Sequence, residues 1–288
     1  MIKIDILCIF ARINFFIMNT IVAATDYSDI AENAVEYAAG IAKLKNERLI
    51  LLNDIEVAFH AENAQLSPGD FEALYQKNET RLQQRASSLG EKYGIEVLPK
   101  TTNSIVESEL NKLIAEYDIY MVVMGMASRS RYQEIWGNTT TKIIKKLPVN
   151  VLAVPAKAKF EGLKKVLFAF DALHGVSEEL LARVKNIALI ANAEVEVLLI
   201  NKSREKTNEE DFYSLQTIDA HFEGIPYHYE NVNADSVVEG IRMEVIRSNA
   251  DLLVMAPQKH GFWDSFVHRS KTRSMASGLD IPLLSVRQ

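Results

Sequence analysis

The chain contains one pattern twice, and this repeat constrains the fold more than any other feature. Residues 21–28 read Ile-Val-Ala-Ala-Thr-Asp-Tyr-Ser, an apolar stretch that ends in an acid and a hydroxyl and leads into a helical pattern. Residues 166–171, Val-Leu-Phe-Ala-Phe-Asp, repeat it, and Ser177 is placed to cap the helix that follows. The copies also end alike, with residues 118–125 and 149–154 matched by 251–256 and 282–286. Such a repeat predicts two structural units of one design.

Within each copy, short apolar stretches alternate with stretches that carry apolar residues at helical spacing. This alternation predicts a parallel sheet with right-handed crossover helices. The expected strands are residues 21–24, 49–52, 95–98, 119–124, 151–154, 166–170, 195–200, 227–230, 252–255 and 283–286. The expected helices are residues 30–42, 67–93 with Gly94 as C-terminal cap, 106–114, 139–146, 177–191, 209–222, 235–248 and 271–278. Ligands of such sheets bind beyond the carboxyl ends of the strands, where Asp26 and Gly125 lie.

Composition narrows the classes of function. A length of 288 residues favours two domains, expected here at 18–155 and 163–288 with a short linker from 156 to 162. A formal net charge of −6 argues against a nucleic-acid-binding surface, which would be basic. The single cysteine, Cys8, excludes an internal disulfide framework and fits a reducing, cytoplasmic compartment.

The first 17 residues are mostly apolar but are interrupted by Lys3, Asp5, Arg12 and Asn14. The segment is too short and too often interrupted to span a bilayer, and no clear signal-peptide cleavage site follows it. We expect residues 1–17 to be an extension outside the native protein, with the natural start at Met18. A chain that begins at Met18 should therefore keep its melting temperature. The alternative is a membrane-associating segment.

The organisation resembles the tandem, two-domain form of the universal stress protein family. The matching residues are Ala24-Thr25-Asp26-Tyr27-Ser28, Val122-Val123-Met124-Gly125, Gly137-Asn138-Thr139-Thr140 and Val151-Leu152-Ala153-Val154-Pro155. We expect two tandem Rossmann-like α/β domains, each a five-stranded parallel sheet in the order 3-2-1-4-5. Their apolar last strands need an edge partner, so the two domains should pack as a pseudo-dimer about an approximate two-fold axis.

The resemblance also implies where a nucleotide would bind. Family members that bind ATP carry Gly, two residues, Gly, nine residues and then Gly-Ser or Gly-Thr, with the early Asp facing the nucleoside. Here Gly125 matches the first glycine, Ser128 replaces the second, and eight residues separate Ser128 from Gly137. The candidate adenine-nucleotide site, for AMP or ATP, comprises Ala24, Thr25, Asp26, Asp54, Met124, Gly125, Ser128, Gly137, Asn138, Thr139 and Thr140.

Two departures weaken the case for ATP. Asp54 adds a carboxylate that is unfavourable for a triphosphate but acceptable for a hydroxyl-rich nucleoside. In the second copy Ala256-Pro257 replaces the first glycine and Arg269-Ser270 replaces the Gly-Ser pair, so this domain is expected to be degenerate.

Structural alternatives exist for the candidate residues. Asp26 and Asp171 fit carboxylates that accept backbone amides at a turn, Gly125 and Gly137 fit turn geometry, and Thr139 and Thr140 fit helix caps. His174, His260 and His268 suggest a metal or anion site, but their spacing matches no zinc pattern, so we expect solvated loop histidines and no metal. The basic run Lys142, Lys145 and Lys146 fits the C-terminal end of a helix.

The sequence has no Walker A loop, no Gly-x-Ser-x-Gly elbow and no His-Glu-x-x-His pair. The leading hypothesis is a non-catalytic cytoplasmic stress-response protein whose first domain binds or once bound an adenine nucleotide. The alternatives are a ligand-free protein-interaction or scaffold module and a slow nucleotide hydrolase. The expected partners are an adenine nucleotide, an unidentified protein client and, beyond the intramolecular pseudo-dimer, a second copy of the chain, with no nucleic acid and no membrane.

Overall fold

The computed structural model describes residues 19–55, 68–126, 143–144, 146–170, 176–202, 209–256 and 281–287. Strands and helices alternate in both halves. The first half contains β1 (Thr20–Thr25), α2 (Asp29–Lys45), β2 (Arg48–Asp54), α3 (Pro68–Tyr93), β3 (Val97–Thr102), α4 (Val106–Glu116), β4 (Ile119–Met126) and β5 (Asn150–Pro155). The second half contains β6 (Lys165–Ala169), α6 (Glu178–Ala191), β7 (Glu194–Lys202), α7 (Glu209–Phe222), β8 (Tyr227–Ala234), α8 (Val237–Ser248), β9 (Leu252–Met255) and β10 (Leu283–Ser285).

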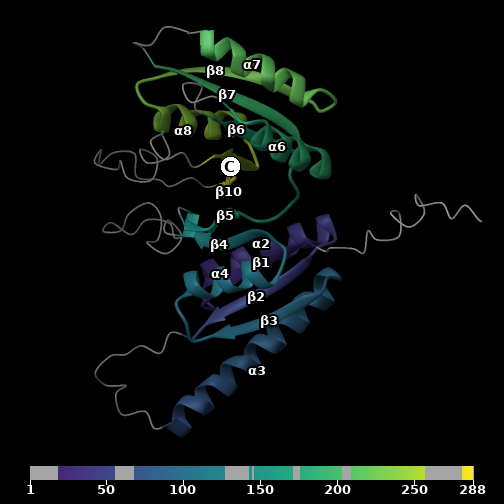
Figure 1. Ribbon diagram of the computed structural model, residues 1–288, viewed down its shortest axis with the longest axis vertical. Coiled ribbons are helices and arrows are strands. Elements are labelled where there is room, and N and C mark those ends of the chain that lie inside the picture. Colours follow the sequence, from purple (N-terminus) through teal and green to yellow (C-terminus); the bar gives the residue numbers. More distant parts are fainter. Residues whose placement is uncertain are drawn as a thin grey trace, which may run out of the picture.

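All ten strands form one sheet in the order β3-β2-β1-β4-β5-β10-β9-β6-β7-β8. Within each half the strands are parallel and follow the predicted order 3-2-1-4-5. The halves meet where β5 and β10 pair antiparallel, with Leu284 opposite Leu152, at the middle of the view in Figure 1. The predicted fold and the edge-to-edge packing of the last strands are therefore confirmed.

Helices cover both faces of the sheet. One core lies between the strands and α2, α3, α6 and α7. The other lies between the strands and α4, α8 and the side chains of Ile143, Ile144 and Leu147. Successive residues of β1 enter opposite cores, with Ile21 and Ala23 in the first and Val22 in the second. A central strand buried on both faces is apolar throughout, which is why the repeat was visible in the sequence.

Local signals set the helix ends. Ser28 and Ser177 cap α2 and α6 by accepting the N–H groups of Ala31 and Leu180. Gly94 follows α3 with φ +69°, which confirms its predicted role as a cap. Residues 1–17, Ser67 and the expected helix at 271–278 lie outside the described residues, as does most of the expected helix at 139–146.

Several elements differ in their bounds from the sequence prediction, among them β3, β8 and α8. β3 begins at Val97 rather than at residue 95 and runs to Thr102, and β8 continues to Ala234 rather than ending at residue 230. Both strands lie at the outer edges of the sheet and are half-exposed, so their apolar pattern ends before their backbone pairing does. α8 starts at Val237 because Ser236, rather than Asp235, is its N-cap. No helix in the described ranges is long and apolar enough to cross a bilayer.

Candidate functional site

The turn between β1 and α2 is held by short side-chain to backbone hydrogen bonds. The N–H of Tyr27 donates to Thr25 Oγ1 at 2.9 Å, and the N–H of Ser28 donates to Asp26 Oδ1 at 2.9 Å. Tyr27 takes the left-handed conformation, with φ 64°. Asp26 is exposed and Thr25 is buried. The carboxylate of Asp26 thus has the predicted structural role at this turn, while its exposure leaves it accessible from solvent.

Thr25 makes two further hydrogen bonds to its neighbours. Its hydroxyl donates to Glu32 Oε1 at 2.7 Å, and its carbonyl accepts from Asn53 Nδ2 at 2.8 Å. Asn53 Oδ1 is buried and has no hydrogen-bond partner among the described residues. Sequence reasoning overlooked Asn53, and the signal that marks it is a polar residue directly after the apolar run of β2.

The described candidate residues lie at the carboxyl ends of three neighbouring strands. Ala24 and Thr25 end β1 and Asp26 follows it, Asp54 ends β2, and Met124 and Gly125 lie near the end of β4. β1 lies between the other two strands. From β1 the sheet grows through β2 and β3 on one side and through β4 and β5 on the other, so the order of strand addition reverses between β1 and β4. Parallel α/β sheets bind their ligands at such a point. Ser128, Gly137, Asn138, Thr139 and Thr140 lie outside the described residues.

Gly125 has a packing role. A Cβ atom at this position would lie 2.9 Å from both the carbonyl oxygen and Cγ2 of Ile30, in the first turn of α2. Backbone cannot yield as a flexible side chain does, so the close approach of β4 to α2 requires glycine. Gly125 is therefore needed for packing whether or not a ligand is bound, and not for the turn geometry that the sequence suggested.

Two arginines of α3 lie over the same turn. The guanidinium of Arg81 is 3.7 Å from the ring centre of Tyr27. Arg85 donates to Glu32 Oε2 at 2.7 Å and to Glu36 Oε1 at 2.8 Å. Burial raises the pKa of Glu36, but hydrogen bonds from Lys92, Tyr93 and Arg85 outweigh it and lower that pKa to about 2. Sequence reasoning did not place these cations beside the site, because their positions depend on how α3 packs.

The second-domain candidates cannot be compared with these residues. Asp171, His174, His260 and His268 lie outside the described residues. Within the described part of the chain, no group of three or more His, Cys, Asp or Glu residues has the geometry to hold a metal ion.

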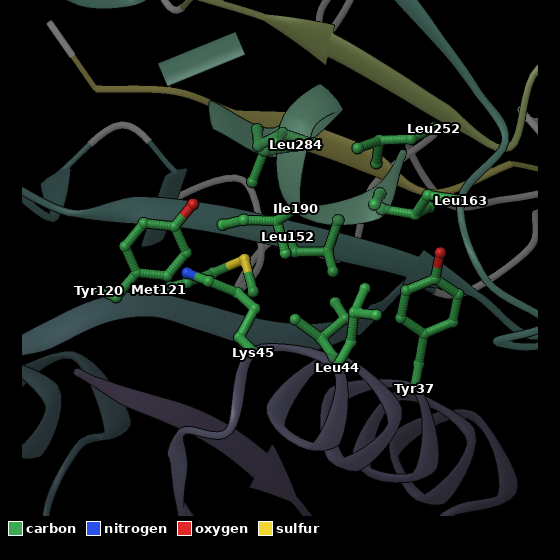
Figure 2. A pocket seen from close by; sticks show the side chains of 13 residues that line it. Tyr37, Leu44, Lys45, Tyr120, Met121, Leu152, Leu163, Ile190, Leu252 and Leu284 are labelled. Carbon is green, nitrogen blue, oxygen red and sulfur yellow. The ribbon is translucent and has the colours of Figure 1, made fainter. Parts of the chain in front are cut away.

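An apolar groove lies elsewhere, on the sheet face covered by α2 and α6, above the junction of β5 and β10. Its volume is about 40 Å³. Figure 2 shows Tyr37 and Leu44 extending from α2 toward Leu152 and Leu284, with the amine of Lys45 beside the ring of Tyr120. The lining residues are Tyr37, Ile41, Leu44, Lys45, Tyr120, Met121, Leu152, Leu163, Ile187, Ile190, Ala191, Leu252 and Leu284.

The lining of this groove is nearly two-fold symmetric. α2 and α6 both end at an asparagine in the left-handed conformation, Asn46 and Asn192. Counting back from these caps, Leu44 corresponds to Ile190, and they are 44% and 37% exposed respectively. Leu152 and Leu284 face each other across the junction. Both halves therefore keep an aliphatic side chain at an exposed position of the rim.

Comparison with known proteins identifies the first half. The sequence pattern of the universal stress protein family matches residues 18–155. The first domain, residues 18–155, therefore belongs to the universal stress protein family. No match was found among curated protein sequences.

Solved structures extend the likeness in fold to both halves of the chain. It is 19% identical to a universal stress protein from Archaeoglobus fulgidus DSM 4304, with a TM-score of 0.69 over 94% of this chain and 99% of that one. It is 15% identical to a functionally unknown protein from Pseudomonas aeruginosa PAO1, with a TM-score of 0.58 over 93% of this chain and 92% of that one. At these identities the likeness establishes a shared tandem fold.

Proposed function

We propose that this universal stress protein binds an adenine nucleotide in its first domain and acts in the stress response without catalysing a reaction. The observation that carries the proposal is that Thr25, Asp26, Asp54 and Gly125 lie together in the first half of the sheet, at the strand ends where the order of strand addition reverses. The matching family motif, with its ATP-binding members, supplies the ligand class. A cytoplasmic location is part of the proposal and rests on the single cysteine.

The charges favour a nucleoside or monophosphate over a triphosphate. Asp26 and Asp54 bring two carboxyl groups to adjacent strand ends, which suits ribose hydroxyls and repels phosphate. Arg81 offsets part of this charge above Tyr27. Ser128 adds a side chain where the family motif has glycine. We therefore expect adenosine and AMP to bind more tightly than ATP.

Calorimetry with adenosine, AMP, ADP and ATP on the full chain tests the proposal. Asp54→Asn should increase the affinity for ATP several-fold relative to adenosine, because it removes a negative charge from the site, which repels the triphosphate most. Asp26→Asn should weaken the binding of all four ligands but preserve the turn, since an amide oxygen can still accept from the N–H of Ser28. Ala256→Gly, at the equivalent strand end of the second domain, is the control and should change nothing.

Two results would contradict this assignment. If none of the four ligands binds, the first domain has lost its nucleotide site. If ATP binds tightly and is lost only on changing Asp171 or His260, the site belongs to the second domain. Release of phosphate or AMP from ATP in the same samples would instead favour the slow-hydrolase alternative.

The apolar groove favours a second candidate function, that of an interaction module. Its proposed occupant is a second copy of this chain, because the groove is two-fold symmetric and continuous with the β5–β10 junction. The exposed aliphatic side chains Leu44 and Ile190 on its rim form the kind of surface that soluble monomers keep small.

Sedimentation velocity over a range of concentrations tests this contact. We expect a reversible dimer that Leu44→Lys or Ile190→Lys weakens at least tenfold, since each variant places a charge in the buried contact. Ile246→Lys is the matched control, because Ile246 is 82% exposed on α8, against the opposite face of the sheet. A chain that stays monomeric, or a dimer that all three variants weaken alike, would rule out the groove as the interface.

A further inference from the structure

The second domain buries two carboxyl groups against each other. Glu196 on β7 is 2% exposed and Glu244 on α8 is 1% exposed. Val195 and Val197 of β7 enter the core beneath α6 and α7, so Glu196 between them points to the opposite face, where α8 packs. Neither residue belongs to the candidate nucleotide site or to the groove.

Each carboxyl group has one oxygen that faces a cation. Glu196 Oε2 lies 3.2 Å from His228 Nε2 and 3.6 Å from Lys165 Nζ. Glu244 Oε2 lies 2.9 Å from Arg247 Nε. The other oxygen of each, Oε1, is fully buried and has no donor among the described residues.

One proton satisfies both remaining oxygens. The two carboxyl groups lie within hydrogen-bonding reach of each other, so a protonated carboxyl can donate to the ionised one. Without that proton, two negative charges face each other in a site from which water is excluded, and two buried acceptors lack a donor. We propose that Glu196 and Glu244 form a site for a single shared proton, and that filling it in mild acid stabilises the second domain.

The direction of the pH dependence follows from the pKa of Glu196. Burial and then the neighbouring Glu244 raise this pKa from its ordinary value to about 6, while Lys165 and His228 act in the opposite sense. A raised pKa means that the folded state holds the proton more tightly than the unfolded chain does. The stabilisation is therefore complete below the ordinary glutamate pKa and is lost as the pH rises through about 6.

Charged groups from every packed element surround the pair. Lys165 comes from β6, Glu194 from β7 itself, His228 and Glu230 from β8, and Arg247 from α8. His228 Nδ1 lies 2.8 Å from Glu194 Oε1, and Arg247 donates to Glu230 Oε1 at 2.7 Å. His228 lies between Glu194 and Glu196 and carries a titratable imidazole of its own. A variant that removes only the shared proton is needed to separate the two.

Glu244→Gln is that variant. Its amide oxygen can still accept from Arg247, and its N–H group supplies Glu196 with the donor that the shared proton otherwise provides. The unfolding midpoint of the full chain should be measured for both proteins between about pH 5 and pH 8. As the pH falls, the native chain should become more stable relative to the variant, so that the ratio of their unfolding constants changes by about tenfold. Glu47→Gln is the control, because Glu47 is also buried but its neighbour is Lys45, at 2.6 Å.

A direct titration decides the matter even if the variant folds poorly. Carbon-13 NMR of the glutamate carboxyl groups in the unaltered chain, assigned through the backbone, should show Glu196 titrating with a midpoint near 6. A midpoint at the ordinary glutamate value would overturn the proposal. Parallel pH profiles for the native chain and Glu244→Gln would overturn it as well.

Discussion

At the scale of single residues, buried asparagines join parts of the chain that are distant in sequence. Asn33 on α2 donates to the carbonyls of Pro155 and Ala158, and so ties the linker to the first domain. Asn150 donates to the carbonyl of Tyr120 and accepts from the backbone N–H of Arg287 near the C-terminus. Each amide satisfies backbone groups that would otherwise be buried without partners.

Gly125 provides a prediction at this scale. Gly125→Ala should lower the free energy of unfolding by about 1–3 kcal/mol with no nucleotide present, because the new Cβ overlaps backbone atoms of Ile30. Urea denaturation of the purified chain measures this. The equivalent Ala256 already carries a Cβ, so Ala256→Gly should cost far less. If Gly125→Ala is as stable as the native chain, then the glycine is not needed for packing and its role is confined to ligand binding.

The sequence identified Gly125 and Asp26 as special but left the reason for each open. An acid after an apolar strand indicates a turn, and the structure places its carboxylate on the N–H of Ser28. The contact of Gly125 with Ile30 joins distant segments, and no local pattern predicts it. Asn33 was unpredictable for the same reason, since its partners lie at the end of β5 and in the linker.

At the scale of elements, three helices end in the same way. Asn46, Asn192 and Asn249 follow α2, α6 and α8 in the left-handed conformation, with φ of 53°, 51° and 53°. Asparagine tolerates this conformation better than residues other than glycine. These caps went unnoticed in the sequence because asparagine is common in loops of every kind.

Asn192 makes this observation testable. Asn192→Ala should cost about 1–2 kcal/mol, because alanine resists the left-handed conformation, whereas Asn192→Gly should be neutral or slightly stabilising. Asn186→Ala on the exposed side of α6 is the matched control and should stabilise slightly, since alanine favours helix. Thermal unfolding of the three variants measures the differences. Equal effects at positions 186 and 192 would argue against the cap.

Strand boundaries were less predictable than helix boundaries. Ser177 and Gly94 mark helix ends by local chemistry, and those two predictions are confirmed. β3 and β8 extend beyond their apolar residues because backbone pairing with β2 and β7, rather than side-chain burial, defines their ends.

At the scale of the whole molecule, pairing of β5 with β10 leaves β3 and β8 as the outer edges of the described sheet. β3 includes Pro99 and Lys100, residues that discourage further strand addition. β5 needs no such protection as an edge, because it is paired with β10 and fully buried in the intact chain.

A fragment of residues 18–155 should therefore dimerise. Its β5 edge lacks the partner that β10 provides, and pairing with a second β5 restores equivalent hydrogen bonds and burial. Sedimentation velocity should show a dimer of the fragment, with Leu44→Lys included to block the groove. The full chain carrying Leu44→Lys, whose β5 is already paired, is the control. A fragment that remains monomeric and folded would show that pairing at the β5–β10 junction contributes little to the stability of the first domain.

Pairing of the halves was predictable because apolar last strands cannot remain at an edge. The groove and the Glu196–Glu244 pair were not predictable. The first depends on the spacing of α2 and α6 across two domains, and the second depends on which side of α8 meets β7.

The antiparallel junction of β5 and β10 also has a genetic consequence. Two separate polypeptides joined through such strands would assemble in proportion to their concentrations and would exchange partners on dilution. Here the short linker fixes a one-to-one stoichiometry, so the halves stay together at any copy number in the cell. Each half is inherited together with its partner. Substitutions at the strand ends of one half can therefore accumulate without appearing in the other half.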